Sequence, residues 1–256
     1  MEGKDRLIYI YGINPVQEAF KVKDALKEIY ISKKRVSGLK NIMALADENS
    51  IPVKIVDDSF IENIAKGVHQ GVLAKVKPKK TINLQEALSI PDKRNEPAFF
   101  LILDLIEDPQ NFGAILRTAD AAGVHAVIYQ KRRSAGVVPS VWKASSGAVW
   151  HVNLVEINNI KYAIRALKDN NIKIIGAEAK GKNLLWETDL TQPVALITGS
   201  EGGGIRQSVL SLCEEVVSIP MKGMVNSLNV SVATALFVYE VIRQRSYFTR
   251  SSLKIL

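Results

Sequence analysis

Two stretches near the C-terminus predict the fold: LITGSEGGGI (Leu196–Ile205) and IPMKGMVNSLNVSVATALFVYEVI (Ile219–Ile242). Each begins as an apolar strand and continues into a loop of glycines or small polar residues, and the second loop opens a long helix. Open α/β sheets bind small molecules at the carboxyl ends of their strands. The pattern therefore predicts a ligand site at one edge of a sheet.

The glycine loop has neither of the common phosphate-binding spacings. A dinucleotide fingerprint needs G-x-G-x-x-G in the first βα unit with an acidic residue about 20 positions later, and a Walker loop needs G-x-x-x-x-G-K-[ST]. The loop Gly199–Gly204 matches neither pattern. On residue types alone, it is as consistent with a plain turn as with a ligand loop.

The composition is that of a soluble globular protein with one large domain or two ordinary ones, since 47% of the 256 residues are hydrophobic and 23% are charged. The net charge of +8 is shared equally between residues 1–96 and 97–256, which favours a nucleic acid touching both parts. The single cysteine, Cys213, excludes a disulfide framework and is expected to be a buried helix residue. The histidines show no metal-ligand spacing, so we expect no metal. Without a signal peptide or an apolar run of membrane length, we expect a cytoplasmic protein.

The chain is expected to form two domains. Residues 7–77 alternate short strands and helices, which predicts a small α/β unit. A basic segment flanked by prolines follows, partly helical near Leu84–Leu88, and is typical of a linker. From Ala98 on, apolar strands alternate with helices, which predicts a mostly parallel sheet covered on both faces. The expected units are residues 1–78, a linker at 79–96 and a second α/β domain at 97–256.

Three short polar segments each admit two interpretations. His69–Gly71 precedes a predicted strand and favours a plain turn over a functional loop. Lys33–Arg35 and Lys131–Arg133 both favour solvated surface over phosphate contacts. The second basic triplet, however, follows a strand at the edge where the site is expected, and there it can meet nucleic-acid phosphates.

The first strand of the second domain leads into DLIEDPQNFGAILRTADAAG (Asp104–Gly123), whose residues suggest chemistry. Pro109 sets a turn, Asn111 is expected to cap the following helix, and Arg117 lies nearly two turns further along. Taken alone, Asn111 is most simply a helix cap and Arg117 an exposed charge.

Three polar loops nevertheless follow strands of one parallel sheet, so we expect them to emerge at the same edge and to converge. Their polar residues are Asn111 with Arg117, then Glu201, then Ser227 with Asn229. They contain no Ser/His/Asp order, no carboxylate pair and no metal cluster. This inventory favours catalysis by positioning and electrostatics over covalent or metal chemistry.

The same loops resemble the motifs of a known enzyme family. Asp108–Gly123, Thr198–Gly204 and Ile219–Ala233 are similar to the three ordered motifs of the SpoU/TrmH family of RNA ribose 2′-O-methyltransferases. The segments IYGINPVQEAF (Ile10–Phe20) and HQGVLAKVKP (His69–Pro78) resemble the substrate-binding domain of the branch that methylates guanosine in bacterial 23S rRNA. Together the two resemblances span nearly the whole chain.

The resemblance implies a fold, a cofactor and a reaction. Members have a C-terminal trefoil knot, an exception to the rule that chains do not thread, assemble as homodimers and bind S-adenosyl-L-methionine in the knot. A ribose 2′-oxygen attacks the sulfonium methyl group in line, and no metal is needed. Carried onto this sequence, the cofactor contacts are Thr198, Gly199, Glu201, Ile219, Met221, Leu228 and Ser231. The catalytic candidates are Asn111, Arg117, Glu201, Ser227 and Asn229.

Two residues modify this picture. The family's arginine is proposed to activate the hydroxyl, but a guanidinium is a poor base. We therefore expect Arg117 to clamp the adjacent phosphate and to stabilise the developing alkoxide, with the base unassigned. Trp150 stands where many rRNA-acting relatives have glutamate, a departure that concerns the substrate pocket or dimer contacts rather than the chemistry.

The sequence thus predicts an RNA ribose methyltransferase dependent on S-adenosyl-L-methionine, acting on guanosine in 23S rRNA. The nearest alternative is a tRNA or antibiotic-resistance ribose methyltransferase. Outside this class stands a catalytically silent RNA-binding protein, against which the retained Asn111, Arg117, Glu201 and Ser227 argue. A nucleotide-binding oxidoreductase is the other rival, and the missing dinucleotide fingerprint argues against it.

Overall fold

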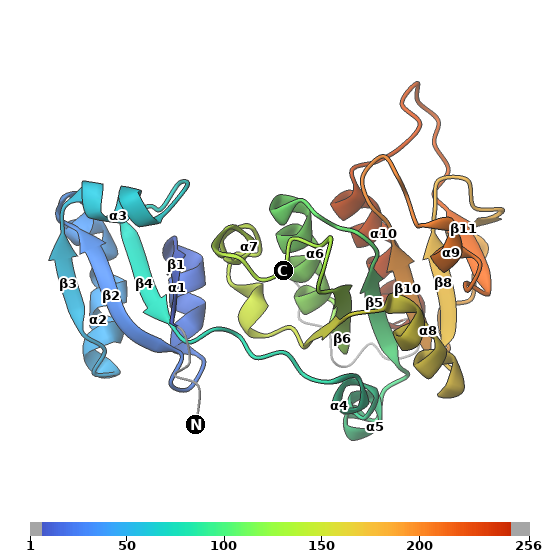
Figure 1. Cartoon of the computed structure of the whole chain (residues 1–256), viewed down its shortest axis with the longest axis horizontal. Coiled ribbons are helices and arrows are strands. Elements are labelled where there is room, and N and C mark those ends of the chain that lie inside the picture. Colours follow the sequence, from blue (N-terminus) through green and yellow to red (C-terminus); the bar gives the residue numbers. More distant parts are fainter. Residues whose placement is uncertain (1–6, 247–256) are drawn as a thin grey trace.

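The computed structural model describes residues 7–246, which form a small and a large α/β domain joined by a helical segment (Figure 1). The small domain has a four-stranded sheet of order β1-β4-β2-β3, in which β4 is antiparallel to both of its neighbours. Its elements are β1 (Ile8–Tyr11), α1 (Ile13–Phe20), β2 (Leu26–Ser32), the 3-10 helix η1 (Lys33–Leu39), α2 (Lys40–Glu48), β3 (Val53–Val56), α3 (Asp58–Ile64) and β4 (Val72–Val76). The small α/β unit predicted from the sequence is thus confirmed.

The connecting segment contains two short helices, α4 (Leu84–Leu88) and α5 (Ile90–Arg94). A capping box fixes the start of α4, because the Asn83 side chain accepts from the Glu86 backbone N–H at 2.8 Å and the Glu86 carboxylate accepts from the Asn83 N–H at 2.9 Å. Leu84 is buried against the large sheet. The predicted helix near Leu84–Leu88 is therefore confirmed, whereas α5 was not predicted.

The large domain is built on a seven-stranded parallel sheet of order β7-β6-β5-β10-β8-β11-β9. Its strands are β5 (Phe99–Leu103), β6 (Ala126–Gln130), β7 (Leu154–Ile157), β8 (Lys173–Ala177), β9 (Asn183–Leu184), β10 (Val194–Thr198) and β11 (Glu215–Ser218). Its helices are α6 (Pro109–Ala121), α7 (Pro139–Ala144), η2 (Ala148–Trp150), α8 (Ile160–Asp169), η3 (Leu185–Glu187), α9 (Gln207–Leu210) and α10 (Val230–Ser246). The trefoil knot that the resemblance implies stays a prediction.

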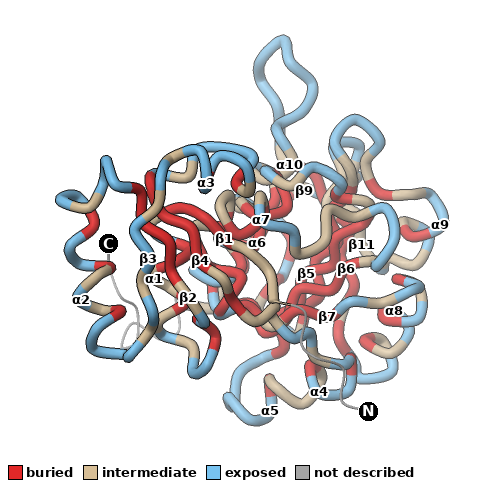
Figure 2. The backbone as a smooth tube through the Cα atoms, turned by 60° about the vertical axis from the view of Figure 1, so that its left-hand side comes forward, coloured by how far each residue is buried: buried red, intermediate tan, exposed pale blue. Residues whose placement is uncertain are grey.

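Both faces of the large sheet are covered, as the apolar strands predicted. Alternate residues of β5 enter different cores: Leu101 packs in the layer of α6, α7 and α10, whereas Ile102 packs in the layer of α8 and α9. Figure 2 shows the central strands of both sheets as largely buried and the loop between β11 and α10 as exposed. Within residues 7–246, no helix is both long and apolar enough to cross a membrane.

Two local expectations were wrong. Asp108, not Asn111, caps α6, since its carboxylate accepts from the Asn111 backbone N–H at 2.9 Å. Cys213 does not lie in a helix, because α9 ends at Leu210, and its side chain is only partly buried. Burial still raises the pKa of the Cys213 thiol to about 11, which disfavours the reactive thiolate.

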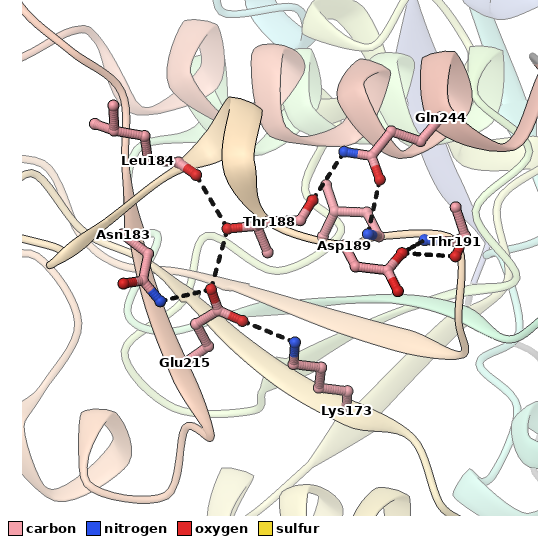
Figure 3. Close-up of polar contacts among 9 residues, drawn as sticks. Lys173, Asn183, Leu184, Thr188, Asp189, Thr191, Glu215 and Gln244 are labelled. Carbon is pink, nitrogen blue, oxygen red and sulfur yellow. Dashed lines mark hydrogen bonds and ion pairs between the residues drawn. The ribbon is translucent and has the colours of Figure 1, made fainter.

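The short edge strand β9 is held by a polar network (Figure 3). The Glu215 carboxylate accepts from Lys173 Nζ, Asn183 Nδ2 and Thr188 Oγ1 at 2.7, 2.7 and 3.1 Å. Gln244 of α10 donates to the Thr188 carbonyl at 2.9 Å. These contacts join strands β8, β9 and β11 to the final helix.

Arg245, at the end of α10, closes the other end of the sheet. Its guanidinium donates to the carbonyls of Pro97, Ala98, Leu190 and Gln192 at 2.8, 3.0, 3.2 and 2.7 Å. Burial lowers the pKa of Arg245 to about 10. One side chain therefore ties the final helix to the chain just before β5 and just before β10.

The two domains meet where α1 packs on α7 and η2. Trp150 is buried there, with its ring 4.3 Å from that of Trp142, and its Nε1 donates to the Pro15 carbonyl of the small domain at 3.3 Å. Beside it, His151 Nε2 lies 2.7 Å from the Glu18 carboxylate. The residue that departs from many relatives thus lies in the contact between the domains.

Candidate active site

Side chains from the three predicted loops meet at the carboxyl edge of the large sheet. Asn111 Nδ2 donates to Glu201 Oε2 at 3.1 Å, while Asn111 Oδ1 accepts from Asn229 Nδ2 at 2.9 Å. Asn229 Nδ2 also lies 3.4 Å from Glu201 Oε1. The expected convergence of these loops is confirmed for Asn111, Glu201 and Asn229.

Helix starts hold the two amides in place. The Asp108 cap and Pro109 begin α6, which leaves Asn111 buried in its first turn. Asn229 Oδ1 accepts from the Ser231 N–H at 2.9 Å and from the Ser231 hydroxyl at 2.6 Å, so the Asn229 NH₂ group is the part left to face Asn111. The contacts with Ser231 therefore orient the Asn229 amide, and the Asp108 cap places the Asn111 backbone.

The glycine loop doubles back on itself after β10. Ser200 and Gly204 exchange backbone hydrogen bonds at 3.0 and 2.9 Å, and a Cβ on Gly199 would lie 2.0 Å from the Gly204 carbonyl carbon. Gly204 has φ +62° and packs against the Glu178 carboxylate, which accepts from the Ile205 N–H at 3.0 Å. The glycines are therefore needed for the close turn that presents Glu201.

An ion pair between a buried carboxylate and a partly exposed arginine supports this turn. Asp104, fully buried at the end of β5, accepts from Arg206 Nε at 2.8 Å and from the Arg206 backbone N–H at 3.0 Å. Arg206 Nη2 also donates to Gln130 at the end of β6. These contacts tie the residue after the glycine loop to strands β5 and β6.

Sequence reasoning missed Asp104, Glu178 and Arg206. The one available signal was the position of Asp104 directly after an apolar strand, where a buried carboxylate needs a partner.

The predicted cofactor residues lie in three places: at the end of β10, against the core, and on the exposed loop before α10. Thr198, Gly199 and Glu201 lie at the end of β10, and Ser231 is linked to them through Asn229. Ile219 is partly buried against the core.

Met221 and Leu228 instead lie on the exposed loop of residues 219–229, with 38% and 37% of their surface accessible. Figure 1 shows this loop rising from the carboxyl edge of the sheet.

The edge of the sheet has features that fit a bound cofactor. Thr198 Oγ1 is buried without a hydrogen-bond partner among residues 7–246, which is the state expected of a group that a ligand would satisfy. The backbone at Gly199 and Gly204 leaves no room for side chains, and Met221 and Leu228 supply apolar surface nearby in sequence. A cofactor with both polar and apolar parts would suit this combination of the Thr198 hydroxyl, glycine backbone and apolar side chains.

Arg117 and Ser227 do not join the hydrogen-bonded cluster. Arg117 is exposed and lies about 9 Å further along α6 than Asn111, on a different side of the helix. Its Nη1 donates to Ser146 Oγ at 3.3 Å, in the turn between α7 and η2. Ser227 is exposed on the long loop. Ser146 was missed in the sequence, and nothing in its spacing from Arg117 marks the contact.

Models of two protein families match the chain. The SpoU rRNA Methylase family matches residues 98–239, and the family described as RNA 2′-O ribose methyltransferase substrate binding matches residues 9–82. The two matches coincide with the large and the small sheet.

Individual relatives agree with the family models. The chain is 37% identical to the 23S rRNA (guanosine-2′-O-)-methyltransferase RlmB of Escherichia coli K12, over 93% of this chain and 98% of RlmB. It is 36% identical to YacO of Bacillus subtilis, assigned to the TrmH family of tRNA/rRNA methyltransferases, over 93% and 96% of the two chains.

The solved structure of the SpoU methyltransferase AviRb from Streptomyces viridochromogenes, in complex with AdoMet, shares the fold with a TM-score of 0.76. It is 21% identical and covers 93% of this chain and 90% of its own. The chain belongs to the SpoU rRNA methylase family.

Proposed function

We propose that this protein transfers a methyl group from S-adenosyl-L-methionine to a ribose 2′-hydroxyl of RNA, at a guanosine of 23S rRNA. The observation that carries the proposal is the cluster of Asn111, Glu201 and Asn229, which joins all three family motifs at one edge of the sheet. The identity to RlmB over nearly the full length of both chains supports the choice of rRNA and of guanosine.

The cofactor would be held at the end of β10. Thr198 would use its unpartnered hydroxyl, Gly199 its close main chain, and Ile219, Met221 and Leu228 their apolar surface. When bound, S-adenosyl-L-methionine supplies an electrophilic methyl group on a sulfonium. Glu201 and Ser231 complete the proposed cofactor contacts.

The protein's own part in the reaction would be positioning. Asn111 and Asn229 fix the relative placement of the three loops, and Arg117 is exposed for contact with an RNA phosphate next to the target ribose. A guanidinium there would also stabilise negative charge developing on the 2′-oxygen. Ser227, on the exposed loop, stays a catalytic candidate, and the base is unassigned.

We also propose that the protein acts as a homodimer, with residues 1–78 as the RNA-binding domain, 79–96 as the linker and 97–256 as the methyltransferase domain. Residues 1–6 and 247–256 of these ranges lie outside the described structure. Support for a dimer comes from α10, where Val232, Leu236 and Tyr239 share one face and stay 49%, 38% and 48% exposed. Sedimentation velocity of the wild type and of Leu236→Glu tests this, and a monomeric wild type would contradict it.

The proposed function is tested by methyl transfer from labelled S-adenosyl-L-methionine to total rRNA and total tRNA, offered separately. We expect 2′-O-methylguanosine in 23S rRNA, mapped by nuclease digestion and mass spectrometry. Arg117→Ala should abolish turnover while cofactor binding persists, because the role proposed for Arg117 is an RNA contact and its side-chain hydrogen bond goes to Ser146, not to a proposed cofactor residue. Label in tRNA alone would overturn the assignment to rRNA, and normal turnover of Arg117→Ala would remove Arg117 from the mechanism.

A further inference from the structure

A pocket of about 590 Å³ lies in the small domain, outside the candidate active site. It forms where β2 ends and β4 begins, and its lining includes Lys34, Arg35, Asp58 and His69. The hollow is shallow and open to solvent, and its volume is large enough for a single nucleotide to lie against it. Lys34 and Arg35, from the segment expected to be solvated surface, and His69–Gly71, expected to be a plain turn, therefore line one pocket.

The charges of the pocket are not balanced. Lys34 Nζ pairs with Asp58 at 2.9 Å, and Asp58 also accepts from the Ser32 hydroxyl. Arg35, by contrast, has no acidic partner among residues 7–246. A Cβ placed on Gly71 would lie 2.4 Å from Arg35 Cγ, so the aliphatic part of Arg35 packs on the glycine. The packing positions an uncompensated guanidinium at the pocket, as phosphate recognition requires.

His69 adds a second donor. Its Nδ1 accepts from the Gly71 N–H at 3.1 Å, so in the neutral ring the proton must lie on Nε2. That nitrogen is free to donate, since no hydrogen bond from it is found within residues 7–246. Beside it, Val68 is 76% exposed and offers apolar surface to a base or ribose. Phosphate, hydroxyl and apolar groups of a nucleotide would all find partners here.

The pocket is linked to the methyltransferase domain through Gln70. Gln70 Oε1 accepts from Lys143 Nζ of α7 at 2.5 Å and from the Ile13 N–H at 3.1 Å. Three residues after Lys143, Ser146 contacts Arg117. In Figure 1, α3 lies over the small domain and the loop that rises from the large sheet lies over the large domain, both on the upper side of the molecule. An RNA strand leaving the pocket would therefore pass α7 on its way to Arg117.

We propose that the pocket of Arg35, His69 and Gly71 binds a nucleotide of the RNA substrate away from the target ribose, with Arg35 on its phosphate. This proposal rests on the proposed function, since it deepens how the same RNA is held. The contact through Gln70 and Lys143 sets the separation between this nucleotide and the one presented to Arg117. Substrate selection then includes a second position on the RNA.

The test uses Arg35→Gln in the full chain, with Lys33→Gln as matched control. Lys33 belongs to the same 3-10 helix but pairs with Asp57 at 2.9 Å and lies outside the pocket. With a 23S rRNA transcript, Arg35→Gln should weaken binding about tenfold and lower the salt slope by about one, against less than twofold for the control. KM for the transcript should rise with kcat unchanged, and cofactor binding should not change. His69→Ala should weaken binding in the same direction.

Equal effects of Arg35→Gln and Lys33→Gln would overturn the proposal, because general charge would then explain both. A fall in kcat without a change in KM would overturn it too. Competition with inorganic phosphate and guanosine monophosphate separates an RNA site from a free-phosphate site, and full displacement by either at micromolar concentration would argue for the latter. The binding and salt-slope measurements need no methyl transfer, so they still decide the proposal if the proposed function fails.

Discussion

At the scale of single residues, the two partners of the ion pair between Asp104 and Arg206 differ in burial. Asp104 is fully buried, whereas the Arg206 side chain is 35% exposed and can be solvated if its partner is lost. We expect Arg206→Ala to lower the free energy of unfolding by about 3 kcal/mol, since it leaves a buried carboxylate without its charge partner. Asp104→Asn should cost less. Urea unfolding of both variants checks this order, and a larger loss for Asp104→Asn would contradict it.

Residue roles were predictable where position in the sheet decided them. Asn111, Glu201 and Asn229 follow strands of one parallel sheet, so their meeting could be expected without knowledge of any distance. The cap of α6 was assigned to Asn111 instead of Asp108 because both residue types favour helix starts; Pro109, which directly follows Asp108, was the signal that favoured Asp108. The contact of Arg117 with Ser146 depends on how α6 packs on α7, which local pattern does not encode.

At the scale of elements, η2 makes the joint between the domains. Trp150→Glu would place a carboxylate in a buried contact and lose the hydrogen bond to Pro15, so the domains should separate. We expect a larger radius of gyration by small-angle scattering and a lower Tm, with a smaller change for Trp150→Phe, which keeps a ring. Trp186→Phe is the control, because Trp186 is 49% exposed. Unchanged scattering for Trp150→Glu would remove Trp150 from the joint.

The edge strand β9 should make stability depend on pH through Glu215. Burial alone would raise its pKa, but hydrogen bonds from Lys173, Asn183 and Thr188 hold the pKa below the ordinary 4.5. A lowered carboxylate pKa adds stability above pH 4.5 that is lost as the pH falls through the folded-state value. Glu215→Gln should therefore cost about 1–2 kcal/mol at neutral pH and less in acid.

Chemical denaturation at pH 7 and pH 4 measures the difference between Glu215→Gln and the wild type. The neighbouring Glu214→Gln serves as control, because Glu214 is 44% exposed and 3.6 Å from Lys168. A cost of Glu215→Gln that stays constant with pH would contradict the assigned role.

Elements were predictable when they were long or strongly apolar. The apolar strands of the large sheet and the helices α6 and α10 were expected because their apolar patterns are continuous. The short α7 and β9 were not, since six and two residues carry too little pattern. Polar contacts such as those of Glu215 hold β9 in place, and their partners come from distant parts of the chain.

At the scale of the whole molecule, the net charge of +8 should govern RNA affinity. Replacing Lys131, Arg132 and Arg133 by Ala should flatten the dependence of RNA binding on salt. The triplet follows β6 at the carboxyl edge, but Lys131 lies 3.6 Å from Glu156, so the slope should fall by about two rather than three. Filter binding of a 23S rRNA transcript across salt concentrations tests this. An unchanged slope would place the triplet outside the RNA contact.

The hydrogen bonds of Arg245 to four backbone carbonyls affect how the protein folds during its synthesis. The carbonyls of Pro97 and Ala98 precede the first strand of the large sheet, yet their charged partner is synthesised almost 150 residues later. The small domain can complete its sheet while the ribosome is still translating, because its strands end at Val76. The large domain must wait in an unfinished state until its last helix emerges. Strand β5 can pair with β6 and β10 earlier, but the carbonyls of Pro97 and Ala98 stay without this partner until translation reaches Arg245.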